Sequence, residues 1–595
     1  MPNPVLCIPP ELAVRIQDHL IFLYGRERSR QCYPQLGSLL AEFHRRNPEM
    51  LTSAKPFSHT DSILITYGDQ VREPGRPPLQ SLAEFLCQQA QGTVTAVHLL
   101  PFFPYSSDDG FSIIDYTQVD PALGSWEDVA QLRAEFALMF DAVLNHISSQ
   151  SYWFQRFLQD DPAFADFFIT IEPGTDLSQV TRPRARPLLT SVQTPSGEKL
   201  VWTTFSGDQI DLNYANPDVL LQVIEVLLLY VEQGASLIRL DAIAYLWKSI
   251  GTNCIHLEQT HRVVQLVRAM LDAVAPNVKL ITETNVPHEE NITYFGDGTH
   301  EAQMVYQFPL APLALNAIQT GQATHLSRWA AGLSLPSDQV AFFNFTASHD
   351  GIGVTPVRGI LSPSEVQALV DQALAHGGHV SYKTNPDGSQ SVYELNISYF
   401  DALSDPKGRE PQATQVGRFM VSQAIMLALI GVPGIYAHSL FGSRSWPEGV
   451  AQTGRPRSIN RQTLQRAELE AELSDSRSIR HQVFSAYTHL LRQRASHRAF
   501  DPHGRQQVMF NNPALLILLR TSPDGRDRVL CMHNVSGAEQ ACQLPAADFT
   551  GPLVDLISGE PYGAAGQQLC PALRPYQALW LNCSAREDRN RDSSP

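Results

Sequence analysis

The chain has 595 residues, of which 43% are hydrophobic and 17% charged, and its formal net charge is -16. This length exceeds what one compact core accommodates, so we expect several domains, and the composition is typical of a globular enzyme. The negative charge argues against a nucleic-acid partner and against an anionic membrane surface. A small anionic substrate stays open, because a local group of arginines can override the global sign.

Cysteines and the N-terminal segment indicate the compartment. Eight cysteines are scattered without a CxxC pair, a pattern typical of reduced thiols and not of a zinc site or a disulfide framework. The first residues lack a basic segment followed by an apolar core, so no signal peptide is predicted. The longest apolar run, around Val226 to Val231, is too short to cross a bilayer. We predict a cytoplasmic protein, with a homodimer left open.

Residues 1–58 are predicted to form an N-terminal helical extension. Apolar residues recur at helical spacing after Pro9-Pro10, and Gly25 is a plausible stop. A second helix is predicted from Leu36 to Arg45. No chemistry is expected from this segment, which would pack against a neighbouring domain.

Residues 59–497 alternate between short apolar strands and helical segments. Eight strands are expected, at Ile63–Tyr67, Val94–Leu100, Leu138–Val143, Ser236–Asp241, Lys279–Glu283, Gln303–Gln307, Ala341–Phe345 and a stretch ending at Tyr436. This order predicts an α/β fold, a (β/α)8 TIM barrel, in which catalytic residues occupy the C-terminal ends of the strands. Two long insertions, at about 148–212 and 353–415, are predicted as irregular loop subdomains that cover a site.

The texture changes after residue 497. Residues 498–583 carry short apolar strands and predict a C-terminal all-β domain. Its expected strands are Leu515–Leu519, Val529–Val535, Leu553–Ile557 and Ala578–Asn582. Residues 584–595 are predicted to be a disordered tail.

One strand ends with two opposite charges on the same face. Arg239 and Asp241 are two residues apart, so their side chains point the same way and lie about 7 Å apart along the strand. Buried charges need partners or a function. On this stretch alone two readings stay open: a structural ion pair, or a nucleophilic carboxylate held ionised by its arginine neighbour.

Four stretches together resemble the conserved regions of the α-amylase family of retaining glycoside hydrolases and transglycosidases. They are Asp141 to His146 (DAVLNH), Ile238 to Ala242 (IRLDA), Ile281 to Thr284 (ITET) and Ser348 to Asp350 (SHD). Each stretch alone is weak, but all four occur in the right order at predicted strand ends. The resemblance implies a pair of carboxyl groups about 5 Å apart. By this match Asp241 is the nucleophile, Glu283 is the acid/base with a raised pKa, and Asp350 stabilises the transition state.

Further motifs resemble the sucrose phosphorylase branch of that family, whose members pass glucose to inorganic phosphate. They are Leu99 to Phe111, Arg182 to Arg184, Gln209 to Leu212, His349 to Gly353, Tyr393 to Asn396 and Ile459 to Arg461. The match implies sugar contacts by Asp108, His146, His349 and Arg239, with Asp108 on the glucosyl 4- and 6-hydroxyls.

The same match implies that Tyr393 and Asn396 lie on a mobile acceptor loop. Phosphate or an acceptor carboxylate would bind Arg184, Arg455 and Arg457, since arginine holds such groups bidentately. The alternative for these three is that they are solvated surface arginines.

Three departures from sucrose phosphorylase resemble the glucosylglycerate phosphorylase subgroup. They are Asn285 in place of a histidine, the N-terminal extension, and the loop Ser439 to Trp446. The resemblance implies reversible phosphorolysis of 2-O-α-D-glucosyl-D-glycerate to α-D-glucose 1-phosphate and D-glycerate. Sucrose or glucosylglycerol as substrate, an α-glucoside hydrolase, and a catalytically inactive binding protein remain as alternatives.

The resemblance also bears on cofactors. Asn145 matches a position that helps to bind calcium in many amylases, but the sucrose phosphorylase branch generally lacks that ion. We predict no metal and no organic cofactor, with inorganic phosphate as co-substrate.

Overall fold

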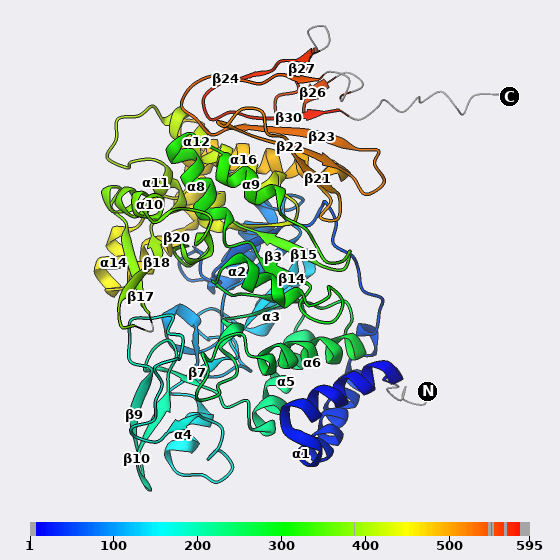
Figure 1. Cartoon of the computed structure of the whole chain (residues 1–595), viewed down its shortest axis with the longest axis vertical. Coiled ribbons are helices and arrows are strands. Elements are labelled where there is room, and N and C mark those ends of the chain that lie inside the picture. Colours follow the sequence, from blue (N-terminus) through cyan, green and yellow to red (C-terminus); the bar gives the residue numbers. More distant parts are fainter. Residues whose placement is uncertain (1–7, 386, 546–548, 550–552, 564–567, 584–595) are drawn as a thin grey trace, which may run out of the picture.

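Eight parallel strands form a closed barrel at the centre of the computed structural model, which describes residues 8–385, 387–545, 549, 553–563 and 568–583 (Figure 1). Around the barrel the strands follow one another in chain order. They are β1 Ile63–Thr66, β3 Ala96–Leu99, β6 Ala137–Ala142, β12 Ala235–Leu240, β13 Lys279–Thr282, β14 Met304–Tyr306, β15 Ala341–Asn344 and β19 Val432–Tyr436. Each overlaps a predicted strand, so the predicted (β/α)8 barrel is confirmed.

The barrel strands are buried almost throughout, which explains why they read as continuous apolar runs. Two buried charged residues interrupt these apolar runs. Asp141 on β6 and Arg239 on β12 are register partners and therefore lie side by side. This pairing places a carboxylate and a guanidinium together near the end of the barrel where the strands stop.

Helices follow most of the strands and cover the outside of the barrel. They are α2 Pro78–Gln89, α3 Trp126–Glu135, α5 Pro217–Glu232, α6 Glu258–Val274, α7 His288–Asn291, α8 Leu310–Thr320, α9 Thr324–Ala331, α12 Gln412–Ala428 and α16 Ile479–Ala495. In α5 the side chain of Asn216 caps the helix by accepting from the backbone of Asp218, and Pro217 occupies the first turn. No helix within the described residues has the length and apolar character that a membrane crossing needs.

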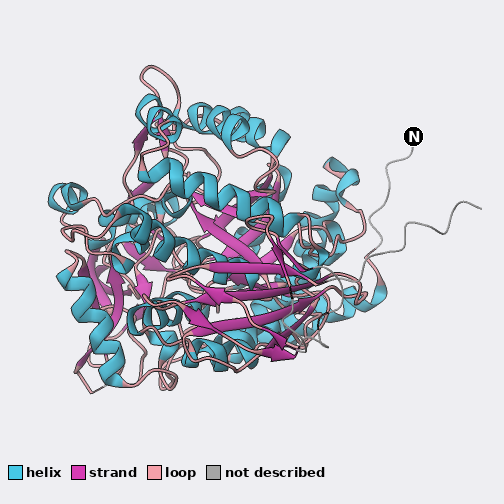
Figure 2. Ribbon diagram, turned by 90° about the horizontal axis from the view of Figure 1, so that it is seen from above, coloured by secondary structure: helices cyan, strands magenta, loops and turns pink. Residues whose placement is uncertain are grey.

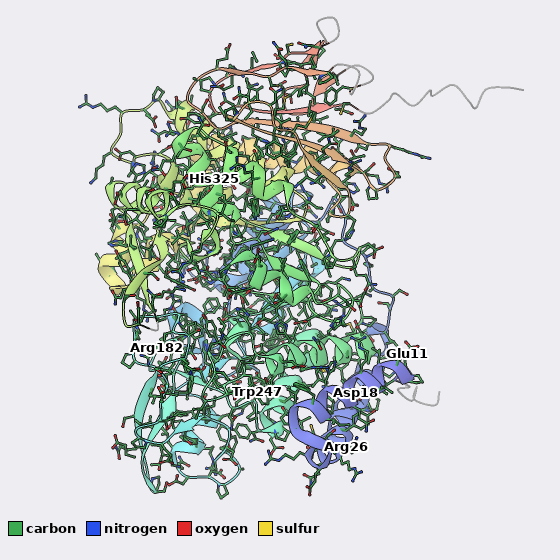
Figure 3. All side chains as sticks on the ribbon, viewed as in Figure 1. Glu11, Asp18, Arg26, Arg182, Trp247 and His325 are labelled. Atoms are coloured by element: carbon green, nitrogen blue, oxygen red, sulfur yellow. The ribbon has the colours of Figure 1, made fainter. Side chains whose placement is uncertain are left out.

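The N-terminal extension is the helix α1 (Pro10–Arg46), which packs on α5 and α6. Gly25 has a φ of 75° and interrupts the helix, as predicted. The second half then continues directly from residue 26 and includes Pro34, so it starts earlier than the predicted Leu36. Glu11, Asp18 and Arg26 mark this extension in Figure 3. The hydroxyl of Tyr24 donates to the carbonyl of Tyr214 at 3.0 Å and fastens the bend to the barrel domain.

The two insertions carry regular structure that the sequence analysis did not predict. The first holds β7 His146–Ser148, α4 Tyr152–Leu158, β8 Thr170–Ile171, β9 Leu189–Thr194, β10 Gly197–Trp202 and β11 Gln209–Asp211. The second holds β16 Ile352–Gly353, α10 Pro363–Ala375, β17 His379–Thr384, β18 Gln390–Asn396 and α11 Tyr399–Leu403. Figure 1 shows the β9–β10 and β17–β18 hairpins on the same side of the molecule. Arg184 and Tyr393, 5.1 Å apart from guanidinium to ring centre, join the two insertions.

The C-terminal part is a sheet-rich layer, as predicted. Its main sheet has six strands in the order β21-β22-β23-β30-β26-β27, and Figure 2 looks onto this end of the molecule. The strands are β21 Arg505–Val508, β22 Leu515–Thr521, β23 Arg528–Asn534, β26 Leu553–Asp555, β27 Pro561–Tyr562 and β30 Ala578–Asn582. The tail predicted for 584–595 lies outside the described residues, and the predicted domain boundaries stay predictions.

Candidate active site

Arg239 is the centre of a group of carboxylates at the C-terminal ends of the barrel strands. Its Nη1 atom donates to Asp141 and, at 2.8 Å, to Oδ1 of Asp241. Its Nη2 atom lies 3.7 Å from Oε2 of Glu283. Asp141 also contacts Nε2 of His98 at 2.7 Å. The buried guanidinium of Arg239 therefore lies within ion-pair distance of three carboxyl groups from three neighbouring strands.

The backbone at the end of β12 brings Asp241 and Glu283 together. Ala242 adopts a φ of 48°, a left-handed conformation that side-chain-bearing residues rarely adopt and that is often found at active sites. Its amide donates to Oε2 of Glu283 at 3.1 Å. The turn thus points a hydrogen-bond donor from the Asp241 strand at the carboxyl group of the next strand.

The pKa values of the two carboxyl groups are both raised, with burial as the main cause. Burial lifts the pKa of Glu283 to about 7, opposed by Arg239 and assisted by the neighbouring charge of Asp241. Burial also raises the pKa of Asp241, and Arg239 opposes this rise through its direct contact. The contact of Arg239 with Asp241 and the raised pKa of Glu283 agree with the sequence prediction. The raised pKa of Asp241 was not predicted: burial outweighs Arg239, which also pairs with Asp141.

Asp350 lies beyond β15 in a separate group of charges. Its Oδ1 atom is 2.5 Å from Nη1 of Arg457 and 3.6 Å from Nη2 of Arg461. The remaining edge of Arg457 forms a bidentate pair with Glu394, at 2.8 and 2.9 Å. Burial alone would raise the pKa of Asp350, but Arg457, His349 and Arg461 hold it well below its usual range. Asp350 is therefore a permanent carboxylate, unlike Glu283.

The predicted sugar-binding histidines lie around the ring of Phe111. His349 stacks on it, with ring centres 4.7 Å apart, and burial lowers the pKa of this histidine to about 3. His146 Nε2 lies 2.9 Å from the carbonyl oxygen of Phe111. Arg239 lies 5.7 Å from the centre of the same ring. The structure brings Arg239 and both histidines into one site.

Asp108 faces the outer part of this site, on the turn η2 (Asp108–Gly110). Burial alone would raise its pKa, but Arg457, Arg461 and Arg184 lower it below the usual range. Asp109 beside it pairs with Arg461 at 2.5 Å. Asp108 is consequently a carboxylate in a cation-rich environment.

Asn285 and Asn396 lie near the base of the second insertion. A Cβ atom on Gly353 would come within 2.7 Å of Nδ2 of Asn285, so this asparagine packs directly against β16. Asn396 is buried and donates to Oγ of Ser381 at 2.8 Å. The Oδ1 atoms of both asparagines are buried without a hydrogen-bond partner within the described residues.

A cavity of about 350 Å³ separates the two insertions. Its lining includes Asp108, Arg184, Arg455 and Arg457. Figure 3 places Arg182, two residues before Arg184, between the two hairpins. Arg184 is half-buried and stacks on Tyr393. Arg455 is exposed and touches Asp109 at 3.4 Å. Of these three arginines, Arg184 alone has no carboxylate partner in the part of the chain that the structure describes.

A lysine side chain contacts Asn145, the residue that the resemblance associates with calcium. The side-chain oxygen of Asn145 accepts from Nζ of Lys248 at 2.7 Å, and the same Nζ lies 2.5 Å from Asp211. Burial lowers the pKa of Lys248, and Asp211 opposes that shift. An ammonium thus already neutralises the oxygen ligands that a cation would use. The described residues contain no cluster of three His, Cys, Asp or Glu side chains able to hold a metal ion.

Several site residues were not singled out from the sequence. Glu394 and Arg461 belong to motifs that were quoted only for their neighbours, and His98 and Phe111 gave no charge signal of their own. Glu394 is the partner of Arg457, although 63 residues separate them. A glutamate between the apolar neighbours Tyr393 and Leu395 is the local sequence signal that could have indicated it.

A closed parallel barrel with carboxyl groups around a buried arginine at its C-terminal strand ends is the arrangement of a barrel enzyme that acts on glycosides. The family model described as "Alpha amylase, catalytic domain" matches residues 90–350 of this chain. A solved sucrose 6F-phosphate phosphorylase from Thermoanaerobacter thermosaccharolyticum has the same fold, with a TM-score of 0.70 at 24% identity over 82% of this chain and 95% of that one.

Sequence relatives narrow the group. The chain is 50% identical to a protein of Allomeiothermus silvanus named glucosylglycerate phosphorylase, over 96% of this chain and 99% of that protein. It is 45% identical to a protein of Escherichia coli with the same name, over 95% of this chain and 99% of that protein. The chain belongs to the α-amylase family, among the relatives of these phosphorylases.

Proposed function

We propose that this chain is a retaining glucoside phosphorylase that converts 2-O-α-D-glucosyl-D-glycerate and phosphate into α-D-glucose 1-phosphate and D-glycerate. The observation that carries the proposal is the 50% identity over nearly the whole length to a protein named glucosylglycerate phosphorylase. The paired Asp241 and Glu283 at the strand ends support the chemistry, because two carboxyl groups are what retaining transfer requires.

In the first step Asp241 attacks the anomeric carbon and forms a glucosyl ester. The bond between that carbon and the glycerate oxygen breaks, and Glu283 donates a proton to the leaving oxygen. The pKa of Glu283, about 7, suits this role, since part of the population is protonated at neutral pH. Arg239 bonds directly to Asp241 and stabilises its ionised form.

In the second step a phosphate oxygen attacks the same carbon and the ester to Asp241 breaks. Glu283, now a carboxylate, accepts the proton that the phosphate gives up. We propose that Asp350 stabilises the positive charge on the sugar ring in both transition states. Asp108, His146 and His349 would hold the glucosyl hydroxyls, with Asp108 on the 4- and 6-hydroxyls.

Phosphate and the glycerate carboxylate would use the cavity between the insertions in turn. Arg184 is the first candidate to bind them, because its guanidinium lines that cavity and is free of the carboxylates that engage Arg457. Arg457 would join only by exchanging Glu394, and Arg455 would contribute from the rim. Tyr393, Asn396 and Asn285 would shape the acceptor side.

We propose that the reaction needs no metal and no organic cofactor, since Lys248 supplies a positive charge at Asn145. We propose a cytoplasmic location, supported by seven free cysteines among the described residues. Whether the protein is a homodimer stays open.

A donor panel assayed with and without phosphate tests the function. The panel holds glucosylglycerate, sucrose, sucrose 6'-phosphate and glucosylglycerol, and glucose 1-phosphate is measured. The expected result is phosphate-dependent release from glucosylglycerate alone. Strong turnover of another donor would keep the mechanism and replace the acceptor, whereas free glucose formed without phosphate would make the protein a hydrolase.

A further inference from the structure

One carboxylate beside the proposed glucosyl site is surrounded by serine hydroxyls. Oδ2 of Asp208 accepts hydrogen bonds from Ser106 at 2.6 Å, from Ser107, and from Ser112 at 2.8 Å. Its Oδ1 accepts from Ser149 at 2.5 Å. None of the roles proposed above uses Asp208, although two of these serines directly precede Asp108.

The segment that carries Asp108 has an unfavourable backbone conformation. Asp108 and Asp109 have φ values of 55° and 51°, in the left-handed region. Gly110 follows with a φ of 108°, and a Cβ atom there would lie 2.7 Å from the carbonyl oxygen of Pro101. Such a conformation persists only where the surrounding structure holds it in place.

Two anchors hold this segment, one on each side of Asp108. On the C-terminal side Asp109 pairs with Arg461, whose Nε donates to the carbonyl of His349 at 2.8 Å. On the N-terminal side Ser106 and Ser107 donate to Asp208. The first anchor connects this segment to the loop that carries Asp350, and the second connects it to Asp208 on the first insertion.

Asp208 is itself fixed to the strand that carries His146. The backbone carbonyl of Asp208 accepts from the amide of Ser149 at 2.9 Å. Its neighbour Gln209 is on β11, which pairs with β7 and hence with His146. Ser148, buried on β7, lies 2.6 Å from the hydroxyl of Ser106. The serine cluster therefore connects Asp108 to His146 through a short path.

We propose that Asp208 is a positioning residue that holds the carboxylate of Asp108 against the glucosyl 4- and 6-hydroxyls. This inference rests on the proposed function, which places Asp108 in the glucosyl pocket. A carboxylate suits the position because it only accepts hydrogen bonds, and four hydroxyls donate to it. An asparagine would turn an NH₂ group toward one side of the cluster, and its neutral oxygen would form weaker bonds.

The charge state of Asp208 agrees with that arrangement. Burial alone would raise its pKa, but the hydrogen bonds from the serine side chains hold it below the usual range. Asp208 is thus an ionised acceptor at every pH at which the enzyme would work.

The test compares two donors, α-D-glucosyl fluoride and its 4-deoxy analogue, by fluoride release. The quantity measured is the preference, the ratio of kcat/KM for the parent to that for the analogue. We expect Asp208→Asn to lower this preference by about tenfold or more, approaching the value of Asp108→Asn, because a hydroxyl contact to a charged group is lost in both. Asp160→Asn is the matched control, since Asp160 also binds a serine, Ser196, on the same insertion but at the far hairpin. It should keep the wild-type preference.

Two further variants keep the test independent of folding. Ser107→Ala and Ser149→Ala each remove one hydroxyl from the cluster and should lower the preference in the same direction by a smaller factor. Equal loss of activity on both donors in Asp208→Asn, or unchanged preference in both serine variants, would overturn the positioning role.

Failure of the positioning role and failure of the proposed function give different results in this experiment. Fluoride release does not depend on the natural acceptor, so a failure of the glycerate assignment leaves the readout intact. A wild-type enzyme that cleaves the fluoride without any preference for the 4-hydroxyl would instead overturn the placement of Asp108, and with it the positioning role.

Discussion

At the scale of single residues, Arg239 makes three carboxyl groups differ from one another. Burial would raise the pKa of Asp141, but Arg239 and His98 lower it to about 2. Asp241 shares the same guanidinium and keeps a raised pKa, while Glu283, at 3.7 Å, reaches about 7. Different environments therefore give chemically similar groups different pKa values, which agrees with the roles of acid and nucleophile proposed for Glu283 and Asp241.

The pKa of Glu283 predicts the alkaline limit of activity. Glu283 must be protonated to act as an acid, so kcat/KM for phosphorolysis should fall as the pH rises through about 7. Glu283→Gln should lower phosphorolysis by orders of magnitude, and Asp241→Ala should do the same, both without unfolding the protein. A pH profile of initial rates measures the first effect.

Glucosyl fluoride provides the control for this profile. Its leaving group needs little protonation, so kcat/KM for fluoride release should lack the alkaline limb and should survive Glu283→Gln far better than Asp241→Ala. An alkaline limb that is identical for both donors would assign the titration to another group.

At the scale of elements, two insertions that are distant in the sequence line the cavity proposed as the acceptor side. The β9–β10 insertion contributes Arg184, and the β17–β18 insertion contributes Tyr393 and Glu394. Glu394 engages one edge of Arg457 and Asp350 the other. Because two carboxylates already pair with Arg457, we propose Arg184 as the cation that binds an incoming anion.

Removal of Arg184 should affect anions selectively. Arg184→Ala should raise KM for phosphate in phosphorolysis, and for D-glycerate in synthesis, by about tenfold or more, since a charge-assisted hydrogen bond is lost. Fluoride release from glucosyl fluoride to water should change much less. Arg182→Ala, two residues away on the same loop, is the matched control and should keep both KM values. Equal effects of the two substitutions would contradict a specific role of Arg184 in anion binding and would indicate a solvated surface arginine.

Arg457→Ala should behave differently. Asp350 would lose its contact at 2.5 Å, so its pKa would rise and transfer to phosphate and to water should both decline. Steady-state rates of the two reactions distinguish the cases: a loss confined to phosphate use would show that Arg457 serves the anion after all.

At the scale of the whole molecule, two buried arginines, Arg494 on α16 and Arg520 on β22, bind backbone carbonyls where the barrel domain meets the C-terminal sheet. Arg494 donates to backbone carbonyls of His59, Leu427 and Gly431, among others. Arg520 donates to the carbonyls of Ala428 and Asp501, both at 2.8 Å. Carbonyls that would be left unpaired at a buried junction are satisfied by a few side chains, which makes the junction sensitive to single substitutions.

The junction predicts a stability effect. Arg494→Met should lower the free energy of unfolding by about 3 kcal/mol or more, because several buried carbonyls lose a charged donor at once. Arg498→Met is the control, since the side chain of Arg498 is 58% exposed and pairs with Asp524 at the surface. It should cost less than about 1 kcal/mol. Urea unfolding followed by circular dichroism measures both, and similar losses would contradict the role of Arg494.

The sequence by itself determined the barrel and the location of its chemistry. Apolar strands of regular spacing are a local signal, and carboxylates placed directly after such strands must meet at one end of a parallel barrel. The strand predictions and the cluster of Asp241, Glu283 and Arg239 follow from that logic, and Gly25 as the helix break follows from the local conformational freedom of glycine.

Only the tertiary structure decided which charges pair. The pairs lie far apart in the sequence: 59 residues separate Ser149 from Asp208, 63 separate Glu394 from Arg457, and 103 separate Asn145 from Lys248. The regular hairpins of the first insertion were likewise missed, because their strands β9 and β10 are only partly buried and lack a strong apolar pattern. Electrostatic interactions depend on proximity in space, which local sequence patterns do not encode. Which arginine pairs with which carboxylate is therefore known only from the fold.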